Sequence, residues 1–101
     1  MDRIEFSNRI NLQGDNFALM ILQFFNQEML LYNMVDTIDD ITVINNDTTN
    51  ISFKLSYKNP AYINALINKI IASPQMIIYD RKYSVSYNVL SNKDIEINIT
   101  E

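Results

Sequence analysis

The sequence contains neither cysteine nor histidine among its 101 residues, and it has one glycine. Without cysteine the chain can form no disulfide and no thiolate metal site. Without histidine it lacks the commonest general base and the commonest transition-metal ligand. A single glycine excludes a glycine-rich phosphate loop. No motif spacing supports lysine, tyrosine or hydroxyl chemistry, so we expect a protein that is not an enzyme and that uses no cofactor and no catalytic or structural metal.

Positive charge is scarce. The chain has 12 acidic and 8 basic residues, for a formal net charge of −4. A net negative field repels phosphate backbones, so we do not expect direct binding to nucleic acid. Arg81 and Lys82 stand between Tyr79 and Tyr83, an arrangement that can stack on bases, but two charges in a turn are more typical of an exposed loop.

Long hydrophobic runs are also missing. The longest is Phe17 to Leu22, far shorter than the roughly 20 residues that span a bilayer. The segment from Met1 to Glu5 is charged and lacks the apolar region of a signal peptide. The expectation is a cytoplasmic protein without a membrane partner.

Changes in hydrophobic period predict the fold. Alternating or short apolar segments predict strands over residues 3–12, 41–45, 50–58, 76–79, 83–89 and 94–99, and helical spacing predicts helices over 16–35 and 59–72. The length and the apolar content fit a single α+β domain over residues 1–101. The order β-α-β-β-α-β-β-β predicts a two-layer sandwich, an antiparallel sheet with two helices on one face, and its first six elements follow the ferredoxin-like order.

The predicted helix 16–35 is apolar over a wider arc than one sheet face can cover. One interpretation is that some of its side chains, represented by Phe17, Phe24 and Phe25, contact a partner, either another protein or a second copy. The alternative is that the rest of the fold covers them. An exposed patch of that size would exceed what monomers usually show.

Three tyrosines, Tyr79, Tyr83 and Tyr87, fall within nine residues, and the last two share one strand face. Tyrosine is enriched in interface hot spots, so all three are candidate partner contacts. The alternative is ordinary strand packing, because tyrosine favours half-buried strand positions.

Four acids form the last candidate site: Asp36, Asp39, Asp40 and, in the next loop, Asp47. Carboxylates at this density can hold Mg²⁺ or Ca²⁺, but the spacing matches no EF-hand loop. A solvated helix C-terminus is the alternative. Because acids at a helix C-terminus oppose the macrodipole, a role in contacting a basic partner is also considered.

These observations favour a non-enzymatic protein–protein interaction domain. A concrete version is an acidic inhibitor, encoded by a phage or mobile element, that blocks a host nuclease or defence complex in the manner of an anti-CRISPR protein. An acidic surface would suit a partner with a basic nucleic-acid-binding surface. The alternative is a small homo-oligomeric assembly domain, such as a homodimer, or a ligand-sensing domain.

Overall fold

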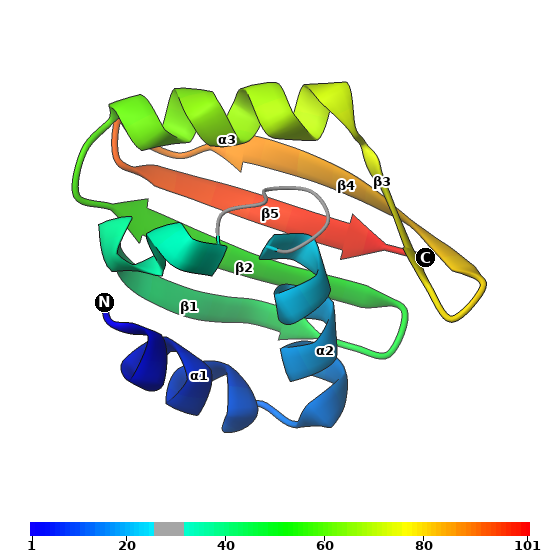
Figure 1. Cartoon of the computed structure of the whole chain (residues 1–101). Coiled ribbons are helices and arrows are strands. Elements are labelled where there is room, and N and C mark those ends of the chain that lie inside the picture. Colours follow the sequence, from blue (N-terminus) through cyan, green and yellow to red (C-terminus); the bar gives the residue numbers. More distant parts are fainter. Residues whose placement is uncertain (26–31) are drawn as a thin grey trace.

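The computed structural model describes residues 1–25 and 32–101. It contains a five-stranded antiparallel sheet with helices on one side (Figure 1), so the α+β prediction is confirmed. The helices are α1 (Arg3–Asn11), α2 (Asp15–Gln23), the 3₁₀ helix η2 (Tyr32–Thr37) and α3 (Ala61–Ala72). The strands are β1 (Ile38–Asn46), β2 (Asn50–Tyr57), β3 (Gln75–Ile78), β4 (Arg81–Val89) and β5 (Asp94–Thr100).

The strand order is β1-β2-β5-β4-β3, so the ferredoxin-like prediction is wrong. The strand β5 lies in the middle of the sheet, paired with β2 on one side and with β4 on the other. Its three isoleucines, Ile95, Ile97 and Ile99, have no exposed surface, which is the burial that a central strand under a helical layer receives.

The N-terminal segment is a helix, not the predicted strand. Phe6 and Ile10, which are four residues apart, are buried on one side of α1, whereas Ile4 and Leu12 are exposed. The Asp2 side chain caps the helix by accepting a hydrogen bond of 2.8 Å from the backbone N–H of Glu5. Alternation of apolar residues was therefore a misleading signal here.

The prediction of one helix over 16–35 is also wrong. α2 ends at Gln23, a π-helical turn follows at Phe24 and Phe25, and residues 32–37 form η2. The part of the predicted helix at residues 26–31 lies outside the described residues. The N-cap of α2 is Gly14, with φ of 101°. A residue without a side chain tolerates that angle between two consecutive helices.

The second predicted helix, 59–72, is confirmed as α3, which begins at Ala61 with Pro60 as its N-cap residue. The Asn59 side-chain oxygen accepts a hydrogen bond of 3.0 Å from the backbone N–H of Ala61. Ile63, Leu66 and Ile70 form the buried side of α3. The predicted strands 41–45, 50–58, 76–79, 83–89 and 94–99 all correspond to observed strands, with ends shifted by up to three residues.

The sheet has one covered face and one open face. In β2, Ile51, Phe53 and Leu55 point toward the helices, and Ser52 and Lys54 point away from them. The ring of Phe53 packs edge-on against Phe17 and Phe24 of the α2 region, with ring centroids 6.3 and 5.8 Å apart. The sheet and the helices thus share one core, and the opposite face is polar.

Candidate functional site

The three phenylalanines that were candidate partner contacts in the predicted helix 16–35 lie in the core. Phe17, Phe24 and Phe25 are at most 1% exposed. Phe24 and Phe25 pack edge-on against each other at 5.3 Å, and Phe25 does the same with Phe6 of α1. α1, which the sequence did not predict as a helix, covers part of this apolar surface. A partner could therefore reach these rings only after α2 or α1 moved, and we do not retain them as contact residues.

The three candidate tyrosines do not form one surface. Tyr83 is buried in β4, and Tyr87 is half-buried against the core, so strand packing accounts for both. Tyr79 is different because its side chain is 85% exposed. It belongs to the turn that joins β3 to β4, where the sequence had suggested the end of a strand.

The turn between β3 and β4 has an unusual backbone. Ile78 pairs with Arg81, so Tyr79 and Asp80 form a two-residue hairpin loop, and both have positive φ, 49° and 68°. A type I′ turn requires this conformation, for which Asn-Gly is the favoured sequence. Aspartate tolerates the left-handed region better than most residues, but tyrosine does not. The hairpin therefore holds an exposed aromatic side chain on a strained backbone.

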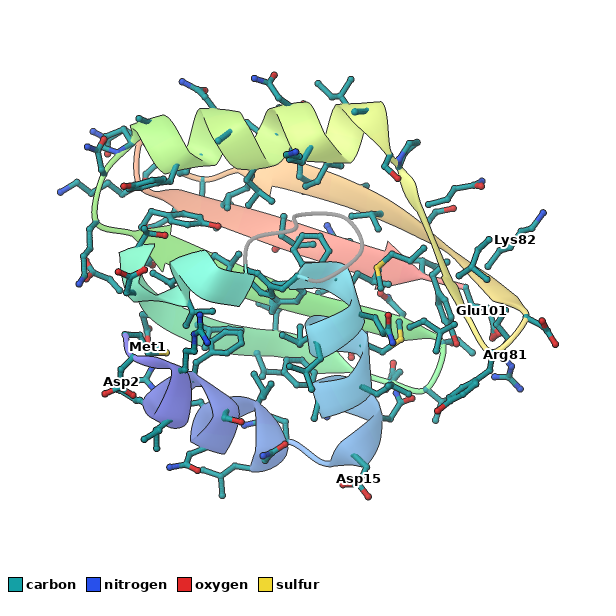
Figure 2. The ribbon with its side chains drawn as sticks, viewed as in Figure 1. Met1, Asp2, Asp15, Arg81, Lys82 and Glu101 are labelled. Carbon is teal, nitrogen blue, oxygen red and sulfur yellow. The ribbon has the colours of Figure 1, made fainter. Side chains whose placement is uncertain are left out.

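We use the name hairpin tip for residues 77–82, which include this loop. Ile77 is 56% exposed and pairs with Lys82 across the hairpin. Arg81 forms a salt bridge of 3.5 Å with Glu101, and Figure 2 shows both side chains near the end of the hairpin. The hairpin tip thus presents two exposed apolar side chains, Ile77 and Tyr79, beside charges of both signs.

The structure separates the four candidate acids. Asp36 in η2 and Asp39 in β1 are exposed, and Asp40 follows in β1, so these acids do not end a long helix as predicted. Asp47 lies in the loop after β1, roughly 20 Å from Asp40 at the usual rise per strand residue. Among residues 1–25 and 32–101, no three acidic side chains are grouped so that they could hold a metal ion.

Asp40 has a specific partner that the sequence did not reveal. The guanidinium of Arg9 in α1 donates a hydrogen bond to its carboxylate, and the hydroxyl of Thr42 donates another at 3.2 Å. Partial burial on its own would raise the pKa of Asp40. The hydrogen bonds from Arg9 and Thr42, the charge of Arg9 and the backbone N–H of Ile41 outweigh burial and hold that pKa below its ordinary value. Asp40 therefore links the edge strand β1 to α1 through its hydrogen bond with Arg9.

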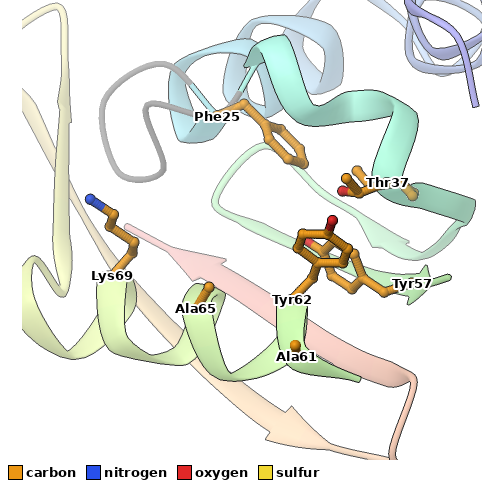
Figure 3. A pocket seen from close by; sticks show the side chains of 8 residues that line it. Phe25, Thr37, Tyr57, Ala61, Tyr62, Ala65 and Lys69 are labelled. Atoms are coloured by element: carbon orange, nitrogen blue, oxygen red, sulfur yellow. The ribbon is translucent and has the colours of Figure 1, made fainter. Parts of the chain in front are cut away.

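An apolar cavity of about 290 Å³ lies between α3, η2 and the adjoining ends of β1 and β2 (Figure 3). Its described lining residues are Phe25, Thr37, Ile38, Tyr57, Ala61, Tyr62, Ala65 and Lys69. The sequence analysis missed it. The four-residue spacing of Ala61, Ala65 and Lys69 is visible in the sequence, but the neighbour that this side of α3 faces is not.

None of three comparisons, with protein-family models, with curated proteins and with solved structures, finds a match to this chain. In the described part of the chain, no helix is long and apolar enough to cross a membrane. The features that bear on function are the hairpin tip, the exposed acids and the cavity.

Proposed function

We propose that the chain is a non-enzymatic protein-binding domain that acts in the cytoplasm and contacts its partner through the hairpin tip. The observation that carries this proposal is Tyr79, an exposed aromatic side chain on a backbone that costs stability. Non-glycine residues in the left-handed region are concentrated at functional sites, because selection for stability alone would remove them. Tyrosine is also among the residues that dominate the energy of protein interfaces.

The neighbours of Tyr79 support a protein partner. Ile77 adds exposed apolar area, and Asp80, Arg81 and Lys82 supply a polar margin. An apolar centre with a charged rim is the usual anatomy of a protein interface. The register of the sheet brings the β1–β2 loop, with Asp47, to the same end of the sheet as the hairpin tip. Asp47 is therefore a candidate for a peripheral contact.

The acidic inhibitor remains our specific version of this function. The net charge of −4 and the exposed Asp36, Asp39 and Asp47 favour association with a basic protein surface, such as the nucleic-acid channel of a nuclease or of a phage-defence complex. On this proposal Tyr79 supplies the short-range contact, and the overall charge speeds the encounter.

Photo-crosslinking tests the proposed surface. A benzophenone amino acid is introduced at position 79 and, as a matched control, at the exposed position of Asn64 on α3. In cells of the native host, we expect a covalent adduct with one protein from position 79 and none from position 64. Equal crosslinking from both positions, or none from either, would contradict the proposal.

Binding measurements with the purified partner complete the test. Tyr79→Ala should weaken the affinity by at least about tenfold, as expected for a hot-spot residue, whereas Asn64→Ala should leave it unchanged. The melting temperature of both variants is measured in parallel. A Tyr79→Ala variant that binds as tightly as the wild type would show that the contact lies elsewhere.

Homo-oligomeric assembly is a second candidate, which the β3 edge favours. β3 is an outermost strand in the order β1-β2-β5-β4-β3, and its four residues, Gln75–Ile78, carry no charge. Uncharged edges readily accept another strand. Sedimentation velocity of the wild type and of Ile77→Lys tests this candidate: a dimer that the substitution dissociates supports it, and a monomeric wild type excludes it.

A further inference from the structure

The cavity beside α3 is open because the helix presents small side chains to it. Ala61 and Ala65 are one turn apart on the lining side of α3, and Lys69 is one turn further (Figure 3). The buried side of the helix carries larger residues, Ile63, Leu66 and Ile70. Larger side chains at 61 and 65 would occupy the space that the alanines leave.

The tyrosines lie at one end of the cavity. The rings of Tyr57 and Tyr62 are 6.1 Å apart between centroids and tilted by 31°, and Figure 3 shows both hydroxyls directed into the cavity. The side chain of Tyr57 is only 4% exposed, and its ring borders the cavity. A ligand in the cavity that accepts a hydrogen bond from its hydroxyl would gain a favourable interaction.

Tyr57 is suited to donate that hydrogen bond. Burial raises the pKa of its phenol far above the ordinary value, so the group keeps its proton at physiological pH. The complementary ligand atom is therefore an acceptor, such as an ether or carbonyl oxygen.

Lys69 defines the other end. It is the one charged side chain among the described lining residues, and it forms no ion pair with any of them. It lies seven positions after Tyr62 on α3, which is about 10 Å along the helix axis. Between the two ends the described lining is mostly apolar, from Phe25, Ile38 and Ala65, and Thr37 is its one further polar side chain.

We propose that this cavity binds an elongated, apolar carboxylic acid whose carboxylate pairs with Lys69 and whose far end carries a hydrogen-bond acceptor for Tyr57. A cavity of about 290 Å³ is at the small end of ligand sites and fits roughly 10 to 15 non-hydrogen atoms. The site is separate from the hairpin tip and does not depend on the protein partner.

Three probes of nearly equal size test the assignment on the full chain. The first, 4-(4-methoxyphenyl)butyrate, carries both the carboxylate and an acceptor. The second, 4-(4-ethylphenyl)butyrate, lacks the acceptor, and the third, 4-(4-methoxyphenyl)butan-1-ol, lacks the charge. Titration by NMR at neutral pH should give saturable 1:1 binding of the first probe. The alcohol should bind about tenfold more weakly, because a hydrogen-bonded charge is lost.

Variants then assign each preference to a residue. Tyr57→Phe should abolish the preference for the methoxy over the ethyl compound, and Lys69→Gln should abolish the preference for the acid over the alcohol. Lys93→Gln, outside the cavity, is the matched control and should retain both preferences. Ala65→Leu, which fills the cavity, should weaken the binding of all three probes. This variant is the second test if Tyr57→Phe does not fold.

Two results would overturn the proposal. One is the absence of saturable binding of the first probe up to about 5 mM, the weak end of small-ligand affinity. The other is binding that Ala65→Leu leaves unchanged, because the probe would then lie elsewhere on the molecule.

Discussion

Arg9 in α1 and Asp40 in β1 form an ion pair that links the N-terminal helix to the edge of the sheet. Their side chains are 40% and 46% exposed. Solvent therefore screens the pair, and we expect it to contribute at most about 1 kcal/mol. The same arginine also pairs with Glu5 one turn earlier, at 3.2 Å.

The first prediction concerns the pH dependence of this pair. Because the folded-state pKa of Asp40 is lowered, the pair stabilises the protein fully above the unfolded-state pKa, and this contribution is lost as pH falls through the folded-state value. Asp40→Asn should therefore be less stable than the wild type at neutral pH, and the difference should shrink below about pH 4. Urea unfolding at several pH values measures it.

Asp39→Asn is the matched control, because Asp39 is an exposed neighbour in the same strand. It should show little change at neutral pH. A difference between the wild type and Asp40→Asn that stayed constant across the acid range would show that the charge of Asp40 is not what stabilises the fold.

The second prediction concerns the strained loop. Replacing Tyr79 and Asp80 with Asn and Gly gives the residues that a type I′ turn favours. We expect the double variant to gain about 1 kcal/mol, which is a rise of several degrees in melting temperature for a domain of this size. Calorimetry measures the gain. Asp47→Gly, in a loop residue without a positive φ, should be no more stable than the wild type.

If Tyr79 contacts a partner, the same double variant should bind that partner more weakly while it folds more stably. Such an inverse relationship is the usual signature of a residue kept for function at the expense of stability. A loop variant that lost both stability and binding would instead indicate that the native turn residues serve the fold.

The third prediction concerns Tyr57. Its raised pKa favours the neutral phenol in the folded state, so its contribution to stability is complete below about pH 10 and declines as pH rises above that value. The stability of Tyr57→Phe should fall less steeply in alkali. In a spectroscopic titration, ionisation of the Tyr57 phenol is the difference in tyrosinate absorbance between the wild type and the variant. This difference should appear only when the protein unfolds. The urea-unfolded wild type is the control, and a phenol that ionised equally in native and unfolded protein would contradict the prediction.

The fourth prediction concerns the contact between the two layers. Phe53→Ala removes the ring that packs against both Phe17 and Phe24, so it should destabilise the fold by about 3–5 kcal/mol. Lys54→Ala, the next residue and on the open face, should change stability by less than about 0.5 kcal/mol. Guanidinium unfolding compares them. Similar losses in the two variants would mean that the helices do not cover the face assigned to them.

The sequence predicted most of the strands because alternation is a local signal. In β2 and β5 every second residue is apolar and buried, and a shift of the register by one residue would expose these side chains. The same rule failed at α1, since Phe6 and Ile10 are four apart and fit both a strand and a helix. The helical signals there were polar: Asp2 as cap, and Glu5 four residues before Arg9.

The strand order and the sites depend on long-range contacts that local patterns do not contain. Nothing in the residues around Asp40 indicates Arg9, which lies 31 positions away and meets it only because α1 packs beside β1. The cavity has the same origin, because Tyr57 and Ala65 become neighbours only after α3 folds back on the sheet. Tyr79 was identified as a candidate, but its exposure follows from a turn that its sequence does not favour.

The central place of β5 also has a consequence for biosynthesis. Among the described strands, β1 and β2 form one hairpin and β3 and β4 form another. Only β5 joins the two hairpins, and it follows both of them in the sequence. A nascent polypeptide that has left the ribosome only as far as Lys93 therefore holds two separate hairpins with no strand between them. The two hairpins can join into one sheet only after the isoleucine-rich segment emerges, so the long-range pairing of this sheet is completed late in synthesis.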